Sequence, residues 1–370
     1  MEFSFSEGQE ILRKTARDFL TDNCTKLFVR KMEDDEKGYS PELWKKMAEL
    51  GWMGLTIPEK YGGTGGDFLD LVVLLEEAGR ALLPSPFVPT VVYSSLPILY
   101  FGTEEQKREF LPKIASGDLI MTLAFIEPNV RYDEAGVQVQ AERKDGDWII
   151  NGTKLFVLDA HIADWLICAA RASEGVTLFL VNTKNPGISC TLLETMAGDK
   201  QCEVSFDKVK VTGNVLGELG RGWEIMEKIK EWAALAQCAL MSGTVQQVLE
   251  MSVAYAKERV QFDRPIGTFQ AIQHTCADLA MEVDGIKFLT YHAAWKLDKG
   301  LPATIEIAAA KAWASDGGRS ACMRGHQVHG GVGIEKEHDM QLYFRRAKTM
   351  ELAFGDGYFH KDIVAKELGL

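Results

Sequence analysis

The sequence is short of positive charge and of long apolar runs, and each shortage excludes a class of function. Its 370 residues contain 41 Lys and Arg against 53 Asp and Glu, which gives a formal net charge of −12. Because phosphate binding needs a basic surface, this balance argues against a nucleic-acid partner. No stretch comes near the roughly 18 apolar residues of a membrane helix, so we expect no membrane span.

Cysteines are few, and none stands in a C-x-x-C or Cys/His metal spacing. The seven are Cys24, Cys168, Cys190, Cys202, Cys238, Cys276 and Cys322. We expect reduced, mostly buried thiols and no metal site. The first residues, MEFSFSEGQEILRK, also lack the basic segment and apolar run of a secretory signal. These features together lead us to expect a cytoplasmic protein.

The hydrophobic period changes twice along the chain. Up to about residue 118 apolar residues recur three and four apart, as in EGQEILRKTARDFLTDN, which predicts helices. From about residue 119 short β-branched and aromatic runs such as GVTLFLVNT predict strands, and KDGDW (Lys144–Trp148) predicts a hairpin turn. The helical period then returns over 222–259, 268–298, 302–325 and 340–368.

This order predicts an α+β protein of three parts. We expect a helical domain at 1–118, a small antiparallel β barrel or sandwich at 119–219, and a helical bundle at 220–370.

Four stretches resemble the acyl-CoA dehydrogenase family. They are AELGWMGLTIPEKYGGTGGD, FGTEEQKREFLPKIASGD, KERVQFDRPIGTFQAIQH and QVHGGVGI, in the family's order and at its distances over essentially the whole chain. The resemblance implies an N-terminal helical domain, a middle β-domain, a C-terminal four-helix bundle and FAD. It also implies an acyl-CoA substrate, whose α-proton goes to a glutamate while hydride leaves the β-carbon for the flavin. Electron-transfer flavoprotein would be a further partner.

In this family each FAD lies across a subunit interface, and the contacts donated to the neighbouring subunit are intact here. Arg259 and Phe262 match the arginine and aromatic at the FAD diphosphate and adenine, and Gln270 matches a further contact. The Q-x-x-G-G loop is matched by Gln327, Val328, His329, Gly330 and Gly331. A guanidinium pairs with diphosphate, and glycines let backbone N–H groups approach it closely. The alternative is ordinary helix-end glycines and a surface arginine.

The contacts that hold the chain's own flavin depart from the family. In AFIEPNVRYD, which takes the place of the family's TEPxAGSD loop, Ile126 replaces threonine, Arg131 replaces glycine and Tyr132 replaces serine. An isoleucine cannot donate a hydrogen bond to the flavin edge, whose buried polar atoms would lose a partner.

The same departure continues in two other stretches. In KLFVLD, Phe156, Val157 and Leu158 stand where the family has tryptophan, isoleucine or valine, and a hydroxyl residue. In the tail, Asp356 replaces a threonine near the FAD phosphates and places negative charge beside negative charge. We therefore expect the chain's own FAD site to be degraded.

The catalytic base is missing from both family positions. Phe354 aligns with the usual glutamate and Ala353 with the tyrosine before it. The other position, on the first helix of the bundle, holds Ala233, followed by Ala234 where the family often has an arginine facing the substrate. Neither phenyl nor methyl accepts a proton. Three carboxylates are weak candidates for a relocated base, against the alternative that they are surface or helix-end groups: Asp356, Glu351 and Glu231.

We interpret the chain as resembling the base-less subunit of hetero-oligomeric acyl-CoA dehydrogenases. It would contribute FAD contacts to a related partner subunit that oxidises acyl-CoA thioesters, bulky, cyclic or steroid-type ones among them. One alternative is a homo-oligomeric enzyme with a relocated base and altered regiochemistry. The other is a flavin-free acyl-CoA-binding protein. The first two readings exclude a monomer.

Overall fold

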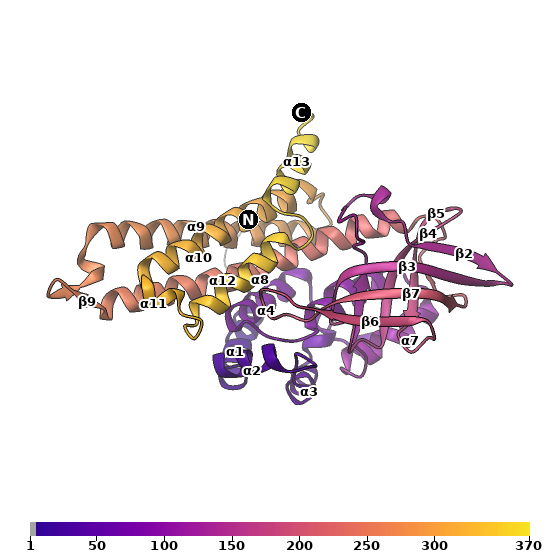
Figure 1. The fold of residues 1–370 in the computed structure, drawn as a ribbon, viewed down its shortest axis with the longest axis horizontal. Helices are drawn as coiled ribbons and strands as arrows, with labels where there is room; N and C mark the ends of the chain where they lie inside the picture. Colours follow the sequence, from indigo (N-terminus) through magenta and orange to yellow (C-terminus); the bar gives the residue numbers. More distant parts are fainter. Residues whose placement is uncertain (1–4) are drawn as a thin grey trace. The chain divides into compact units, whose positions relative to one another are not determined.

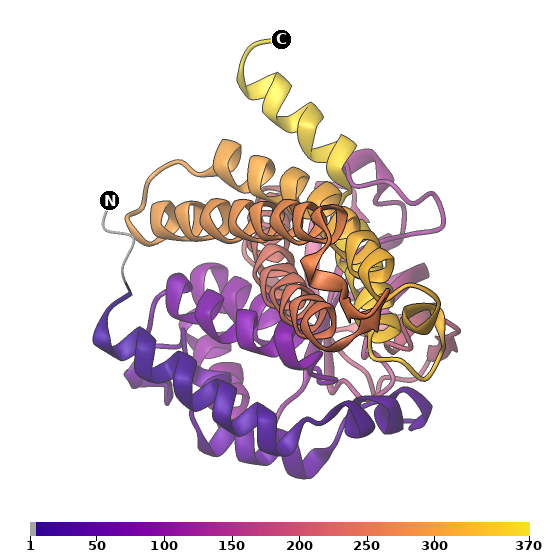
Figure 2. The ribbon, with the colours of Figure 1, turned by 90° about the vertical axis from the view of Figure 1, so that its left-hand side faces the viewer.

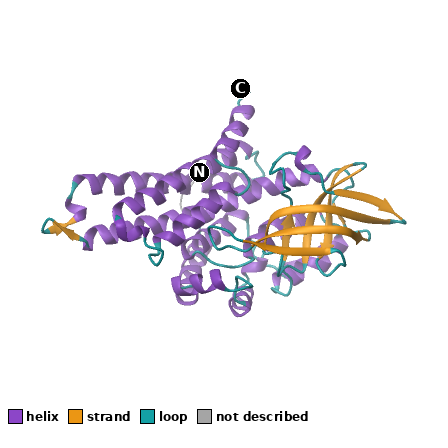
Figure 3. Ribbon diagram, in the orientation of Figure 1, coloured by secondary structure: helices purple, strands orange, loops and turns teal. Residues whose placement is uncertain are grey.

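The computed structural model describes residues 5–370, and the chain forms two compact units. One unit combines residues 1–30, 67–83 and 234–370, and the other combines residues 31–66 and 84–233. The first is built from helices, whereas the second contains the large sheet (Figure 3). Among residues 5–370 no helix has the length and apolar character needed to cross a membrane.

The helical unit is centred on long helices that run side by side (Figure 1). α10 packs on α9, α12 and α13, while α1 packs on α4 and α4 on α9. The elements are α1 (Glu7–Asn23), α2 (Lys26–Asp34, which begins here), α4 (Phe68–Ala81), α8 (Gly222–Glu258, from Ala234 on), α9 (Gln270–Asp298), α10 (Thr304–His329), α11 (Gly331–Ile334), α12 (Met340–Leu352) and α13 (Gly357–Glu367).

Two glycines let α4 and α8 approach backbone to backbone. A Cβ added at Gly79 would lie 2.0 Å from the carbonyl oxygen of Leu240, and one added at Gly243 would lie 1.7 Å from that of Glu76. No side chain fits at either distance, so the crossing requires glycine on both helices.

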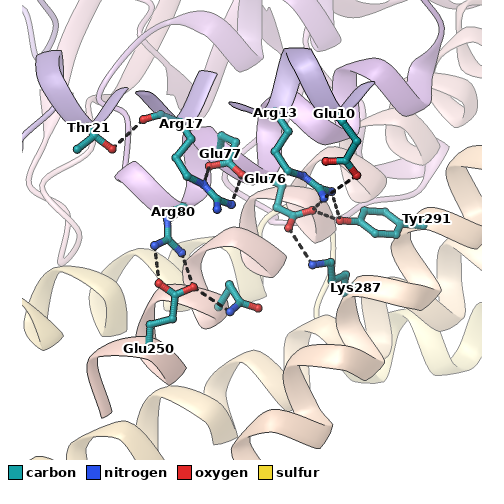
Figure 4. A network of polar contacts seen from close by, with 11 residues as sticks. Glu10, Arg13, Arg17, Thr21, Glu76, Glu77, Arg80, Glu250, Lys287 and Tyr291 are labelled. Atoms are coloured by element: carbon teal, nitrogen blue, oxygen red, sulfur yellow. Dashed lines mark hydrogen bonds and ion pairs between the residues drawn. The ribbon is translucent and has the colours of Figure 1, made fainter. Parts of the chain in front are cut away.

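A buried network of charges joins α1, α4 and α9 inside this unit (Figure 4). Glu76 and Glu77 on α4 are only 3% and 1% exposed. Arg17 donates to both oxygens of Glu77, at 2.9 and 2.6 Å. Glu76 accepts from the Tyr291 hydroxyl and pairs with Lys287 at 3.5 Å. Because buried charges persist only when paired, these contacts fix how the three helices pack.

The second unit is a sheet with helices. In the described residues eight strands form one sheet in the order β6-β7-β3-β2-β4-β5-β8, with β1 beside β4. The strands are β1 (Met121–Ala124), β2 (Gln140–Lys144), β3 (Asp147–Leu158), β4 (Trp165–Ala172), β5 (Gly175–Asn182), β6 (Ile188–Leu193), β7 (Gln201–Val211) and β8 (Val215–Leu216). The helices are α3 (Pro41–Glu49), α5 (Phe87–Thr90), α6 (Leu96–Phe101) and α7 (Glu104–Ala115).

The predicted fold class is confirmed: helices, a β-domain, then a helical bundle, in an α+β chain. The KDGDW hairpin is also present, because Asp145 and Gly146 take φ of 53° and 90° between β2 and β3. The sheet is antiparallel except that β1 pairs with β4 in parallel and β2 does so at Gln140. Alternating side chains indicate a strand but not its direction, which explains this departure.

The tail differs from the single helix predicted over 340–368. α12 ends at Leu352, and α13 begins only at Gly357. Between them Phe354 and Gly355 take φ of 57° and 97°, and the Asp356 carboxylate accepts the Phe359 N–H at 3.0 Å as the N-cap of α13. A left-handed glycine followed by an N-cap aspartate ends one helix and starts the next.

Candidate functional site

The residues of the predicted donated group follow the C-terminal end of α8. Arg259 is exposed, and its side chain has no hydrogen-bond or ion-pair partner among residues 5–370. It leads into a hairpin of β9 (Val260–Gln261) and β10 (Arg264–Pro265). The two tip residues, Phe262 and Asp263, have φ of 52° and 62°, as a two-residue hairpin loop requires. Phe262 is 86% exposed, so the turn presents an aromatic ring to the outside of the chain.

The Q-x-x-G-G loop comes to the same end of the bundle. Gln327 is exposed, whereas Val328 and His329 are buried. His329 Nδ1 donates to the Gly325 carbonyl at 2.8 Å, and its ring stacks on Tyr255 with centroids 4.7 Å apart. Tyr255 lies one turn before Arg259 on α8, so this stack joins the ends of α8 and α10. The β9–β10 hairpin and α11 accordingly lie toward the same end of the unit (Figure 2).

The two glycines of this loop face open space. Gly330 has φ 62° and ψ −143°, a conformation that favours glycine. Gly331 has no left-handed φ, and an added Cβ would meet nothing within 4 Å. Neither strain nor packing within the chain explains glycine at 331. Glycine at this position would allow close approach by a group from outside the chain.

Gln270 is the first residue of α9 and is exposed. The N-cap, Phe269, provides no side-chain hydrogen bond to the first turn. The N-terminus of this 29-residue helix thus keeps backbone donors and a partial positive charge near the hairpin that follows Arg259. This end of the unit suits an anion.

On the sheet unit, a buried ion pair organises the stretches predicted to hold the chain's own flavin. Lys154 and Glu127 are 0% and 4% exposed, with Nζ and Oε1 2.6 Å apart. Lys154 also donates to the Phe125 carbonyl at 3.1 Å. The N–H of Leu155 donates to the Ile126 carbonyl at 2.8 Å. These bonds bring the 126–132 loop and the end of β3 side by side.

The polar groups of that loop pair with one another. Arg131 Nε donates to Asp133 Oδ1 at 2.9 Å, and Asp133 also accepts the Gly136 N–H at 2.9 Å. Asn129 Oδ1 accepts the Arg131 N–H at 3.1 Å. The loop is therefore closed by its own side chains, and Arg131 fills the place of the family's glycine.

The end of β3 presents mainly apolar groups. Phe156 has φ 55° and is 48% exposed, at an irregularity in the pairing of β3 with β7 between Lys154 and Val157. Val157 is buried, and Leu158 is partly exposed, as is Ile126 on the neighbouring loop. No donor side chain stands at the positions of Ile126 and Leu158, as the sequence indicates.

A lysine that the sequence analysis missed supports the turn that carries Phe354. Lys311 on α10 is 1% exposed, and its Nζ donates to the carbonyls of Glu351 and Gly355 at 2.9 and 2.8 Å and to Ser315 Oγ at 3.0 Å. Burial lowers the pKa of Lys311 to about 8. The signal was a lone lysine within the apolar run IAAAKAWA. It holds the turn in place and offers the site no free donor.

The candidate relocated bases already have partners. Asp356 caps α13, and buried Glu351 pairs through Oε1 with Lys348 at 3.0 Å and with Arg319 at 3.5 Å. Glu231 pairs with Lys228 at 2.9 Å. At the second family position Ala233 and Ala234 are buried. Each of the three carboxylates is therefore already engaged in a helix cap or an ion pair within the chain.

Comparison with known families now decides the relationship. The models described as "Acyl-CoA dehydrogenase, N-terminal domain", "middle domain" and "C-terminal domain" match residues 6–118, 122–209 and 220–369. The chain belongs to the acyl-CoA dehydrogenase family. Members of this family are flavin-dependent oxidoreductases, and FAD is their usual cofactor.

Individual relatives agree over their full length. The chain is 34% identical to the probable acyl-CoA dehydrogenase YngJ of Bacillus subtilis, covering 100% of both chains. It matches butyryl-CoA dehydrogenase from Megasphaera elsdenii with a TM-score of 0.93 and 30% identity over 100% of both chains. It also matches a structure of the ChsE4-ChsE5 complex from Mycobacterium tuberculosis, with a TM-score of 0.92 and 28% identity, covering 100% of this chain and 99% of that one.

Proposed function

We propose that this chain is a subunit of an FAD-dependent acyl-CoA dehydrogenase that works with a related partner subunit. It supplies Arg259, Phe262, Gln270 and the Gln327–Gly331 loop to the FAD of the partner and holds no complete flavin site of its own. The substrate class is an acyl-CoA thioester. A bulky, cyclic or steroid-type acyl group suits an assembly in which one subunit has lost its site and leaves room.

One observation carries this proposal: the two groups of flavin positions differ in whether their polar groups are already paired. Arg259 is exposed and has no partner in the described chain, and Gly331 keeps open space around it. Arg131 is paired with Asp133, and Asp356 with the start of α13. A scaffold that never met FAD would have no use for the first group.

The chemistry assigned to this chain is binding and orientation. Arg259 supplies permanent positive charge for a diphosphate, and the glycine loop supplies backbone N–H groups at close range. FAD, when bound, accepts the hydride in the family's reaction. Phe354 cannot remove the α-proton, so that task falls to the partner subunit.

A relative supports assembly with a second chain. The matched structure from Mycobacterium tuberculosis is described as a complex of ChsE4 with ChsE5. We extend that arrangement to this chain because its donated positions are preserved while its own are not. Electron-transfer flavoprotein is the proposed electron acceptor of the assembly.

The visible spectrum of the purified chain tests the proposal. We expect well under one FAD per chain when the protein is isolated alone, even after incubation with excess FAD and desalting. A yellow homo-oligomer with one FAD per chain would overturn the partner-subunit function and favour the homo-oligomeric enzyme with altered regiochemistry. Failure of any flavin to bind to complexes captured with the chain would favour the flavin-free acyl-CoA-binding protein.

A second experiment addresses the base. Phe354→Glu restores the family's residue at that position, but we expect no dehydrogenase activity from the isolated variant, because its flavin positions stay degraded. Activity is followed by reduction of an artificial electron acceptor with butyryl-CoA and with a branched acyl-CoA. Robust turnover by the isolated variant would contradict the degraded site.

A further inference from the structure

The sheet unit contains a cluster of two thiols and an imidazole that the proposed function does not use. Cys190 lies on β6, Cys202 on β7, and His161 in the loop between β3 and β4. The register places Cys190 opposite Val204 and Cys202 opposite Leu192, so the two cysteines are diagonal neighbours on one face of the sheet. Cys202 Sγ lies 3.8 Å from His161 Nδ1.

The orientation of His161 makes it a base for Cys202. Its Nε2 lies 3.2 Å from the carbonyl oxygen of Lys37, which can only accept, so Nε2 carries hydrogen. The neutral ring then presents the Nδ1 lone pair to the thiol of Cys202. Burial lowers the pKa of His161, but the hydrogen bond with Cys202 and the nearby charges outweigh it and raise that pKa. Proton transfer from sulfur to nitrogen is thereby favoured.

Cys202 differs from the other buried cysteines of the chain. Burial raises the pKa of Cys24 and Cys168 to about 11 and that of Cys238 and Cys322 to about 12. Cys202 has no exposed surface either, yet its pKa lies well below the ordinary value. The hydrogen bond from Cys190 and the one with His161 stabilise its thiolate. Since the thiolate is the reactive form, this pair is set apart from the inert thiols.

The cluster is open to small molecules. A cavity of about 170 Å³ is lined by His161, Thr183, Cys190 and Val204, among others. Cys190 is exposed, so its sulfur is the point of access to the pair. All seven cysteines lie in the described residues and are free thiols. A dithiol with a base, an entrance and no existing disulfide has the parts of a redox site.

We propose that Cys190 and Cys202, assisted by His161, form a dithiol site that hydroperoxides oxidise to a disulfide. The contact between the thiols raises the pKa of Cys190, so the resting thiolate is that of Cys202, whose own proton is on His161. The Cys190 proton passes to Cys202, and the Cys190 thiolate then attacks the hydroperoxide. An S–O bond forms, the O–O bond breaks, and the remaining oxygen takes the proton from His161 and leaves as water or alcohol. Cys202 then passes its proton to His161, and its thiolate attacks the sulfur of Cys190 sulfenic acid. The S–S bond forms, the S–O bond breaks, and hydroxide leaves as water with the proton from His161.

The fold allows this bond to close. Diagonal cross-strand positions are about 7–8 Å apart, slightly more than a disulfide spans, so one strand has to shift. Among the strands of residues 5–370, β6 is an edge strand that pairs only with β7, and its central residues are exposed. On its other side β7 pairs with Val157 and Leu158 of β3. The disulfide would therefore lie one strand away from the segment that takes the family's flavin positions.

The test uses the full chain, hydrogen peroxide and mass spectrometry of alkylated peptides. We expect two thiols per chain to be lost together and one disulfide to join the peptides of Cys190 and Cys202. Their loss should be about tenfold or more faster than that of Cys276, a partly exposed thiol on α9 without a base, because His161 can take the proton that the pair loses on forming a thiolate. Disulfides to other cysteines, oxidation of Cys190 with Cys202 untouched, or equal rates at all accessible thiols would overturn the proposal.

Variants separate the roles within the cluster. Cys276→Ser should leave the rate and product unchanged, and Cys202→Ser should stop oxidation at the sulfenic acid, which a dimedone probe detects. His161→Gln should slow the reaction at neutral pH and recover near about pH 9.5, where hydroxide removes the thiol proton. A His161→Gln rate equal to that of the unmodified chain at both pH values would remove the base from the scheme. The disulfide map of the unmodified chain decides the main question even if a variant folds poorly.

Discussion

Two loops of this chain each carry an arginine at a position that the family resemblance assigns to flavin, and the two arginines are in opposite states. Arg259 is exposed beside a hairpin and a glycine loop, and no described residue pairs with it. Arg131 is bonded to Asp133 within its own loop. Under the proposed function, this difference distinguishes a used site, at Arg259, from an abandoned one, at Arg131. A used site keeps charges and glycines that the isolated chain does not need, whereas an abandoned site satisfies its groups internally.

The loop that we propose to be abandoned has nevertheless kept its support. The Glu127–Lys154 pair is buried, and the Glu127 carboxylate also accepts the N–H groups of Gln138 and Val139 at 3.0 Å. If flavin contacts were lost as proposed, the change affected the surface of the loop and not its anchoring. This separates residues that hold the fold from residues that would hold a ligand, and the predictions below test that separation.

The largest expected effect is on stability, at the anchor of the abandoned loop. Glu127→Gln leaves the Lys154 ammonium buried and unpaired, so the free energy of unfolding should fall by about 3–5 kcal/mol. Urea unfolding followed by circular dichroism measures it. The double variant Glu127→Gln/Lys154→Met removes both charges and should recover part of the loss. A single-variant loss below about 1 kcal/mol would show that the pair does not anchor the loop.

The next effect is on affinity, at the used site. Arg259→Ala removes a charge-assisted contact worth roughly 1.5–3 kcal/mol, about a ten- to hundredfold loss in FAD affinity measured on the complex captured with this chain. Arg259→Lys should restore only part, because an ammonium lacks the bidentate fork. The matched control is Arg264→Ala in the same hairpin, whose guanidinium lies over the Phe269 ring at 4.1 Å. Its FAD affinity should stay near that of the unmodified complex.

The stability of the Arg259→Ala chain should barely change, because the side chain is exposed and has no hydrogen-bond or ion-pair partner in the described residues. Unaltered flavin content in the Arg259→Ala complex would reject donation across an interface. A collapse in thermal stability would instead indicate an internal structural role.

The sequence predicted the elements and residues of the two arginine loops better than it predicted how their side chains are paired. The change of hydrophobic period gave the order of helices and strands, and the motifs located Arg259 and the glycine loop. The break at 353–356 was missed because apolar spacing continues across it without a proline, although Gly355 and Asp356 are residues that end one helix and cap the next. That Arg131 pairs with Asp133 depends on the folded loop. The contact between His161 and Cys202 spans 41 residues, and no local pattern indicates it.

A smaller effect is expected at Asp356, where the departure from the family has gained a structural task. Asp356→Ala removes the N-cap of α13 and should lower the free energy of unfolding by about 1 kcal/mol. Asp356→Thr, which restores the family's residue, keeps a capping hydroxyl and should lose less. Thermal unfolding of the three proteins ranks them. If Asp356→Thr alone gave the isolated chain a full complement of FAD, the single charge and not the whole degraded site would be what excludes flavin.

The smallest effect divides the used loop into a binding face and a supporting face. His329 is buried, and its ring stacks on Tyr255. Burial lowers its pKa below the usual 6.5, and the nearby His338 and His326 lower it further. Between that lowered pKa and 6.5 the unfolded chain binds more protons than the folded chain, so the stability present above pH 6.5 is lost as the pH falls. His329→Gln removes this proton uptake, while the carboxylates and His326 stay in both proteins. The stability difference between the two proteins should therefore shrink from pH 7.5 to 5.5, by less than about 1.4 kcal/mol per pH unit.

FAD affinity at pH 7.5 should change far less in His329→Gln than in Arg259→Ala, since the imidazole supports the loop from inside. A stability difference that is flat with pH would contradict the lowered pKa of His329, and an affinity loss as large as that of Arg259→Ala would place its imidazole on the binding face.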